Sequence, residues 1–351
     1  MFSRKHPQAR VVYMAAGGLI AALGLAGPAA AAVNPSVTAA TITEFSTPNL
    51  EPLNIAVLPD ATPYFTASTE GSVPSGQLRI GEITPAGQVA TYSARLLQPA
   101  QSGQSQLGGI TVGPDGNLWF TQEGGTTSQG EGVVYRMTPT GSLSHQRGGG
   151  VLSDPSSITS GPGDKLWFTE NGDEVGSLGI HGGVGGPIST GNGSENIPGT
   201  IVEGPDGNLW VTEANTGQIA RVTPQGVVTQ FQVTDPGTEP GPTYITVGPD
   251  NNLWYVAGDS IGRISTTGGD RADFSVAGLG FNGFPHQIVA GPDGNLWFTV
   301  SGAAQLGKMT VNGVATVVSQ GITGDTDGIA ANSTKVWFTE PASERVGEVS
   351  F

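Results

Sequence analysis

The side chains that could carry chemistry in this chain are histidines and carboxylates. The 351 residues include 4 His, 29 Asp plus Glu and no Cys, which excludes thiolate catalysis, disulfides and zinc–thiolate sites. An imidazole near neutral pH can take up and return a proton, and carboxylate oxygens suit hard cations such as Mg²⁺ or Ca²⁺. Two short segments concentrate these groups, Phe-Pro-His286-Gln-Ile and Asp325-Thr-Asp327-Gly.

Each of these segments leads into a copy of one repeated phrase. Residues 110–122 read Ile-Thr-Val-Gly-Pro-Asp-Gly-Asn-Leu-Trp-Phe-Thr-Gln, and the phrase returns at 158–170, 201–213, 245–256, 288–300 and 329–340, with an eroded first copy at 55–66. All six tryptophans occupy one slot of this phrase: Trp119, Trp167, Trp210, Trp254, Trp297 and Trp337. Self-similarity at a period of 40 to 48 residues indicates a repeat architecture.

Each repeat has the pattern of four short β-strands. Its Ile-x-Val alternates as a strand does, and Leu-Trp-Phe-Thr begins a second strand rich in aromatic and β-branched residues. The intervening Gly-Pro-Asp-Gly-Asn suits a type I turn, and two further strands follow, as at 218–223 and 227–233. The sequence therefore predicts an all-β fold, a seven-bladed β-propeller of four-stranded blades over residues 38–351. The last unit stops after three strands, so Thr41–Ser46 is expected to supply the fourth and close the ring.

In a propeller, the residues just before each repeat's Ile should meet at one mouth of the central channel. Two aligned positions there include histidine or acidic side chains: the position two residues before the Ile and the position four residues before it. The first runs Leu53, Gly108, Ser156, Gly199, Thr243, His286, Asp327, and the second runs Glu51, Gln106, Asp154, Ile197, Gly241, Phe284, Asp325. An acidic and imidazole cluster is therefore expected where units six, seven and one become neighbours.

The tandem phrase Gly-Pro-Asp-Gly-Asn-Leu-Trp-Phe-Thr-Glu resembles the streptogramin B lyase (virginiamycin B lyase) family over essentially the whole chain after its leader. The resemblance implies a propeller whose enzymes use Mg²⁺ to linearise a cyclic depsipeptide antibiotic by elimination at an ester. It implies a site made of a His in the penultimate unit, a Glu-Pro-His-Gly run opening the last unit, and a Glu after that unit's aromatic strand.

Carried onto this chain, the resemblance places His286 at the penultimate-unit His. Asp325 then stands for the metal-binding Glu, Asp327 occupies the place of the catalytic His, and Glu340 lies near the last acidic position. The chain departs from the family at Asp327, because a carboxylate is a weaker base towards a carbon acid than an imidazole. His286 and Asp327 are the candidate catalytic residues. The candidate metal ligands, for Mg²⁺ or Ca²⁺, are Asp325, Glu340, Glu51 and Asp154.

Two functions remain open at this point. One is an exported scaffold with a degenerate lyase site, which holds a small-molecule or cell-envelope ligand at the channel mouth. The other is a divalent-metal-dependent lyase or lactonase that acts on an ester or lactone. The metal-dependent enzyme requires at least three of the candidate carboxylate and imidazole groups to lie within bonding distance of one cation, whereas the scaffold does not.

Some of the acidic residues also fit structural roles in the repeat. The glutamates Glu170, Glu213 and Glu340 fit strand-end contacts with a neighbouring blade. The aspartates of the Gly-Pro-Asp-Gly turns fit turn chemistry: Asp115, Asp206, Asp250 and Asp293.

The first 32 residues have the pattern of a secretory signal peptide, with a basic start, an apolar run and a small-residue cleavage site. We expect residues 33–37 to be a short N-terminal segment and the mature protein to be secreted, with no membrane span after cleavage. Loss of Arg4, Lys5 and Arg10 would change the formal charge from −15 to −18. Such a charge disfavours nucleic acid and anionic membranes as partners, and we expect a monomer.

Overall fold

The computed structural model describes residues 40–68, 77–95, 106–123, 132–147, 154–191, 198–235 and 240–351. Ala39–Phe351 form one compact unit. The expected leader (1–32) and the segment 33–37 lie outside the described residues, as does Ile197. In the part of the chain that is described, no helix is long and apolar enough to cross a membrane.

The described fold consists of seven four-stranded antiparallel sheets and confirms the predicted seven-bladed propeller. Blades 1 to 3 are β2 (Glu51–Val57), β3 (Pro63–Ser68), β4 (Gln77–Ile83) and β5 (Val89–Arg95); β6 (Gln106–Val112), β7 (Leu118–Glu123), β8 (Val133–Met137) and β9 (Leu143–Arg147); and β10 (Ile158–Gly161), β11 (Lys165–Glu170), β12 (Glu174–Gly179) and β13 (Val184–Ser189).

The remaining four blades follow the same order. They are β14 (Ile201–Glu203), β15 (Leu209–Glu213), β16 (Gln218–Val222) and β17 (Val228–Gln232); β18 (Pro242–Val247), β19 (Leu253–Ala257), β20 (Ser260–Ile264) and β21 (Ala272–Ser275); β22 (Phe284–Ala290), β23 (Leu296–Ser301), β24 (Leu306–Met309) and β25 (Ala315–Val318); and β26 (Ile329–Ala331), β27 (Lys335–Glu340) and β28 (Arg345–Ser350) with β1 (Thr41–Ser46). A short 3₁₀ turn, η1 (Pro341–Ser343), joins β27 to β28.

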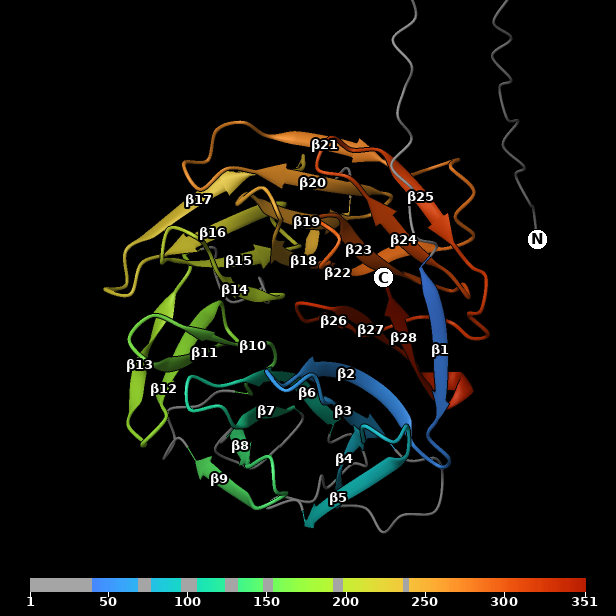
Figure 1. Ribbon diagram of the computed structural model, residues 1–351. Coiled ribbons are helices and arrows are strands. Elements are labelled where there is room, and N and C mark those ends of the chain that lie inside the picture. Colours follow the sequence, from blue (N-terminus) through green and yellow to red (C-terminus); the bar gives the residue numbers. More distant parts are fainter. Residues whose placement is uncertain are drawn as a thin grey trace, which may run out of the picture. The chain divides into compact units, whose positions relative to one another are not determined.

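The N-terminal strand closes the ring, as the sequence predicts. β1 pairs antiparallel with β28, from Thr41 opposite Ser350 to Ser46 opposite Arg345, and Figure 1 shows the blue β1 beside the red β28. The last blade is therefore built from both ends of the propeller. This pairing covers the edge of β28 that would otherwise stay open.

The first strand of each blade lies nearest the centre of the ring (Figure 1). Neighbouring inner strands contact one another, as β2 does with β6 and β18 with β22. We call the end of the ring at which the inner strands β22 and β26 begin the mouth. Because each second strand runs antiparallel to the first, the second strands end at the mouth and begin at the opposite end.

The tryptophan slot lies in the core, and the turn aspartate caps it. The turn from Gly113 to Gly116 is closed by a backbone hydrogen bond, and Oδ1 of Asp115 accepts the Nε1–H of Trp119 at 2.9 Å. Arg136 bonds the other carboxylate oxygen at 2.9 Å and lies over the indole ring. Asp206, Asp250 and Asp293 accept the indole N–H of their own blades in the same way. The predicted turn role is confirmed, and the structure adds this second role.

The threonine after Trp-Phe joins one blade to the next. The hydroxyl of Thr299 donates to the carbonyl of Asp327 in the following blade and accepts the N–H of Gln287 in its own blade. Thr169, Thr212 and Thr339 donate across their own blade boundaries to Gly199, Thr243 and Leu53. Buried hydroxyls therefore tie neighbouring blades together at the mouth end.

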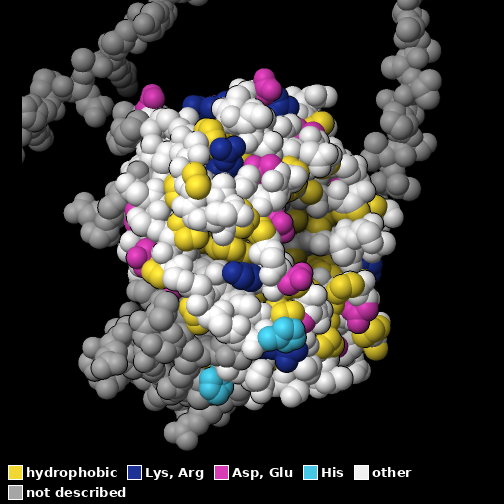
Figure 2. Space-filling view, turned by 90° about the vertical axis from the view of Figure 1, so that its left-hand side faces the viewer, with side chains coloured by type: hydrophobic (Ala, Val, Ile, Leu, Met, Phe, Trp, Pro, Cys, Tyr) yellow, Lys and Arg dark blue, Asp and Glu magenta, His cyan; other side chains and the backbone are white. Residues whose placement is uncertain are grey.

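The surface carries few charges, in keeping with a chain in which 12% of residues are charged. On the face shown in Figure 2, acidic and basic side chains are scattered among uncharged ones instead of gathering into one patch.

Candidate functional site at the mouth of the ring

His286 lies in a bulge at the start of the inner strand of blade 6. The pairing of β22 with β23 shifts between Pro285 and Ile288, and a bulge of this kind changes the direction of the side chains it holds. Nδ1 of His286 lies 2.9 Å from Oδ1 of Asp327, and each side chain is about one-third exposed. The structure thus brings together the two residues that we predicted as catalytic.

The backbone of Asp327 is fixed from both sides. Its N–H donates to the carbonyl of Thr339 at 2.9 Å, which ties it to its own blade. Its carbonyl accepts the hydroxyl of Thr299 at 2.7 Å, which ties it to blade 6. The carboxylate is therefore held at the boundary between the two blades, where it faces the imidazole.

Blade 5 adds an aromatic wall to this pair. The ring of Tyr244 meets the imidazole of His286 edge-on, with 4.7 Å between ring centroids and an interplanar angle of 74°. Tyr244, His286 and Asp327 come from three consecutive blades. Together they form a site that we call the mouth triad, in which the aromatic ring and the carboxylate both restrict the orientation of the imidazole.

Gln287 links the mouth triad to blade 1. Its amide nitrogen donates to Oδ1 of Asn54 at 3.0 Å and to Oη of Tyr244 at 3.4 Å, and its amide oxygen accepts the N–H of Ile329 at 3.2 Å. The sequence prediction missed Gln287, Asn54 and Tyr244. All three stand directly before the Ile of their repeats, so a third aligned position would have identified them.

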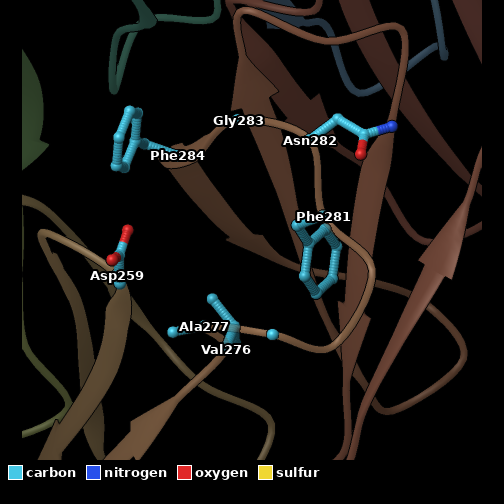
Figure 3. Close-up of a pocket in the computed structure, with 8 residues that line it drawn as sticks. Asp259, Val276, Ala277, Phe281, Asn282, Gly283 and Phe284 are labelled. Carbon is cyan, nitrogen blue, oxygen red and sulfur yellow. The ribbon is translucent and has the colours of Figure 1, made fainter.

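A cavity of about 340 Å³ lies beside the start of β22. Its lining includes Asp259, Val276, Ala277, Phe281 and Phe284. Figure 3 shows Asp259 and Phe284 pointing towards each other, with the ring of Phe281 on another wall. Phe284 precedes His286 by two residues and is 63% exposed, so the cavity lies at the start of the strand that carries His286 and offers apolar surface with one carboxylate.

A family model supports the resemblance of this chain to known lyases. Residues 192–351 match the virginiamycin B lyase family. The structure of a selenomethionine-substituted virginiamycin B lyase from Staphylococcus aureus is 27% identical and covers 89% of this chain and 99% of its own, with a TM-score of 0.73. The chain is a β-propeller similar to virginiamycin B lyase.

Two further solved structures extend this likeness. A catalytically inactive His-to-Ala variant of the Staphylococcus aureus enzyme with quinupristin is 27% identical, covers 89% of this chain and 99% of its own, and has a TM-score of 0.74. A streptogramin B lyase structure at 24% identity covers 89% and 97% of the two chains, with a TM-score of 0.71, and shows the fold alone. No curated protein sequence matches the chain.

The other predicted site residues of this lyase-like propeller point to separate partners. Asp325 is exposed. Oε2 of Glu51 accepts the hydroxyl of Ser68, and Oδ2 of Asp154 accepts the amide of Asn171 at 2.8 Å. None of these contacts joins a candidate metal ligand to the mouth triad.

Glu340 is a buried carboxyl at the end of β27. Its Oε1 accepts the backbone N–H groups of Thr323 and Gly324 at 3.2 and 3.0 Å. Burial raises the pKa of Glu340 to about 7, and the nearby Glu44 adds to this, although the two backbone donors and Arg345 oppose it. Glu340 therefore binds the loop between β25 and β26, which leads from blade 6 into blade 7.

The described residues contain no cluster of metal ligands for the predicted cation. Among the described residues, no group of three or more His, Asp or Glu side chains could hold a metal ion. The geometry of these residues therefore adds no support to Mg²⁺ or Ca²⁺, and the metal stays a prediction.

The mouth triad itself can bind and move a proton. Nδ1 of His286 faces the carboxylate of Asp327, and Nε2 at the other end of the ring can accept a hydrogen bond when it carries no proton. His286 could thus accept a hydrogen bond or a proton from a ligand that lies over the mouth.

Proposed function

We propose that this protein is a lyase-like propeller that binds a small-molecule ligand at the mouth and whose lyase site is degenerate. The observation that carries the proposal is the contact of 2.9 Å between His286 and Asp327, and a cavity of about 340 Å³ lies at the start of the strand that carries His286. A ligand's polar group would meet Nε2 of His286. Its apolar part would occupy the cavity lined by Phe281 and Phe284, as pockets of this size commonly combine apolar walls with a few placed polar groups.

The degenerate character follows from Asp327. In the family that the chain resembles, the corresponding position holds the catalytic His. Here a carboxylate holds that place, and its contact with His286 makes it a positioning group. The mouth triad therefore keeps one imidazole where the resemblance implies two.

An enzymatic role is the second candidate, because an imidazole oriented by a carboxylate is a common general base. In a lyase, His286 would take a proton through Nε2 from the carbon next to the one that bears the ester oxygen, and that C–O bond would break to release a carboxylate. In a lactonase, it would take the proton from the water that attacks the carbonyl and opens the ring. In both cases Asp327 would hold the imidazole and stabilise its protonated form. The enzyme would be a lyase or lactonase. No step is assigned to a metal ion, because the described residues do not gather around one.

Quinupristin, the compound present with the Staphylococcus aureus variant, is a suitable probe for both candidates. The purified protein is titrated with it in a calorimeter, and the mixture is then incubated with Mg²⁺ and analysed by mass spectrometry. Binding without linearisation supports the proposed scaffold. Linearisation supports the enzyme, and absence of both contradicts the proposal for this class of ligand.

Asp327→Asn is the variant that tests the mouth triad, and Asp325→Asn is its matched control. Loss of the charge at Asp327 leaves His286 without its ion-pair partner, so binding should weaken about tenfold. Asp325 is exposed, and its replacement should change the affinity less than twofold. Equal effects of the two variants would contradict the role of the mouth triad.

The double variant Asp325→Glu, Asp327→His tests whether the scaffold can regain lyase activity. Thr326 should be left in place, because its buried hydroxyl accepts the N–H of Val300 at 2.9 Å and donates to the carbonyl of Gln305 at 2.7 Å. Replacing it by the family's Pro would break both bonds. Linearisation of quinupristin by the double variant alone would show that Asp327 is what disables the site.

We also propose that the protein acts outside the cytoplasm after removal of residues 1–32. The basic and apolar pattern of these residues supports this. Expression of the full chain in a bacterial host, followed by mass spectrometry of the exported protein, should give a new N-terminus near Val33. Retention of an intact leader in the cell would contradict it.

A further inference from the structure

A second cavity, of about 410 Å³, lies at the seam where the ring closes. Its walls come from β1 (Phe45), from blade 7 (Lys335, Trp337, Glu348) and from the turns of blade 1 at 60–63 and 83–87. Lys335 begins β27 and Glu340 ends it. The cavity therefore lies at the end of the strands opposite the mouth and is separate from the mouth triad. We call it the seam cavity.

Trp337, which lines the seam cavity, has an indole N–H without a partner. Its Nε1 is buried and makes no hydrogen bond, and the residue is 3% exposed. All six tryptophans lie in described residues, and the other five N–H groups are bonded: four to the turn aspartates and that of Trp167 to the carbonyl of Pro162 at 3.2 Å.

The unpaired N–H has a cause in the sequence. The turn before Trp337 reads Asn-Ser-Thr-Lys and has Ser333 four residues before the Trp, where four other blades have Asp. A buried donor without an acceptor destabilises the fold. An acceptor supplied by a ligand in the seam cavity would therefore be favoured.

The charges around the seam cavity select a neutral ligand. Nζ of Lys335 pairs with Oε2 of Glu348 at 2.7 Å, so the cation is already neutralised. The carboxylate of Asp60 accepts the backbone N–H of Thr62 and leaves the lining with an excess negative charge. An anionic ligand would be repelled by Asp60. A cationic group would suit Asp60 but could not itself accept the N–H of Trp337.

The rest of the lining combines rings with hydroxyls. Phe45 packs against Trp337 with 5.8 Å between ring centroids, and Pro63, Pro85 and Ile83 add apolar surface, while Thr62 and Thr84 add hydroxyl groups. A pyranose matches this chemistry, since it has a C–H face for rings, hydroxyl donors for a carboxylate and oxygen acceptors for an N–H. The volume is in the range of small-molecule sites.

We propose that the seam cavity is a binding site for a neutral pyranose sugar, whose ring oxygen or hydroxyl accepts the N–H of Trp337 and whose hydroxyls donate to Asp60. Such a ligand contacts both β1 and blade 1. Binding would therefore hold the ring closed as well as occupy the site, and it would raise the unfolding temperature. The proposal does not depend on the function at the mouth.

The test is a thermal-shift and tryptophan-fluorescence titration of the purified full chain. The probes are glucose, galactose and N-acetylglucosamine at about 10 mM, where a Kd of about 1 mM would give near-saturation. Glucuronate is the charged counterpart. We expect a saturable rise in unfolding temperature with at least one neutral sugar and a weaker one with glucuronate. No shift with any neutral sugar, or a shift with glucuronate alone, would overturn the proposal.

Two variants assign the effect to the seam cavity. Trp337→Phe removes the N–H but keeps an aromatic ring, and it should abolish the shift. Trp297→Phe is the matched control in the adjacent blade and should keep it. Asp60→Asn changes an exposed turn residue and should weaken binding about tenfold with an intact fold. A sugar-induced shift that persists in both Trp337→Phe and Asp60→Asn would overturn the assignment.

Discussion

At the scale of single residues, the repeat depends on a carboxylate placed four residues before its tryptophan. Burial alone would raise the pKa of Asp293, but the hydrogen bonds from Lys308, Trp297 and Asn295 outweigh it and hold the pKa below its usual value. A carboxyl with a lowered pKa stabilises the fold above its unfolded pKa and loses this contribution as the pH falls. The pKa values of Asp115 and Asp250 are lowered as well, so these three turn carboxylates contribute to the stability of the fold.

Replacement of tryptophan by phenylalanine should lower the free energy of unfolding by different amounts in two blades. Trp297→Phe and Trp337→Phe remove the same volume, but only the first removes a bonded N–H, that to Asp293 at 3.0 Å. Trp297→Phe should therefore lower the free energy of unfolding by about 1–2 kcal/mol more than Trp337→Phe. Urea denaturation of both variants measures the difference, and equal costs would contradict the capping role of Asp293.

The raised pKa of Glu340 predicts that the free energy of unfolding depends on pH. Its pKa is about 7 in the fold against an ordinary 4.5, so between these values the folded state binds more protons than the unfolded state. The free energy of unfolding should fall as the pH rises from about 4.5 to about 7, by up to about 3 kcal/mol. Glu340→Gln should flatten this slope in urea denaturation, while the exposed Asp325→Asn should leave it unchanged. A slope that survives in Glu340→Gln would contradict the assignment.

At the scale of elements, the threonines at the ends of the second strands join the blades. Thr299 and Thr169 make equivalent pairs of bonds, each donating to the next blade and accepting from its own. Blade 5 has Val256 in this position, and there Thr243 instead donates to the carbonyl of Val256 at 3.4 Å. Thr243 and Val256 both belong to blade 5, so this bond lies within one blade and does not replace the hydroxyl bond that Thr299 and Thr169 make to the next blade.

Thr299→Val and Thr169→Val should destabilise the protein by similar amounts, about 1–3 kcal/mol, because each loses two buried hydrogen bonds. Only Thr299→Val should also weaken ligand binding at the mouth, since its two partners are the backbones of Asp327 and Gln287. Denaturation and calorimetric titration of both variants separate the two effects. Weakened binding in Thr169→Val would show that general loosening of the ring explains the result.

At the scale of the whole molecule, the ring is closed by β1, and two of its features depend on that closure. Phe45 on β1 packs on Trp337, and Glu44 binds Thr323 and Arg345 close to Glu340. Removal of β1 would expose the edge of β28 and the apolar surface beneath it.

A chain that begins at residue 47 should therefore unfold at a lower temperature and aggregate more readily than one that begins at residue 40. Scanning calorimetry and light scattering measure this. Equal unfolding temperatures for the two chains would show that three strands suffice for the last blade.

The sequence by itself determined the architecture. Repetition of one phrase set the number of blades, and the incomplete last unit together with Thr41–Ser46 set the closure, because strand patterning and turn chemistry are local properties that each repeat carries in full. Alignment of the repeats also placed His286 and Asp327 side by side in adjacent blades.

Only the tertiary structure decided which aligned residues meet. Glu51, Asp154, Asp325 and Glu340 share aligned or nearby positions with the mouth triad, yet Glu51, Asp154 and Glu340 each bind a partner of their own and Asp325 is exposed. A repeat fixes the place of a backbone position but not the direction of its side chain, which depends on bulges such as that of β22 and on contacts between blades. The unpaired N–H of Trp337 and the seam cavity around it likewise arise from the packing of both ends of the propeller against each other, and no single repeat contains that information.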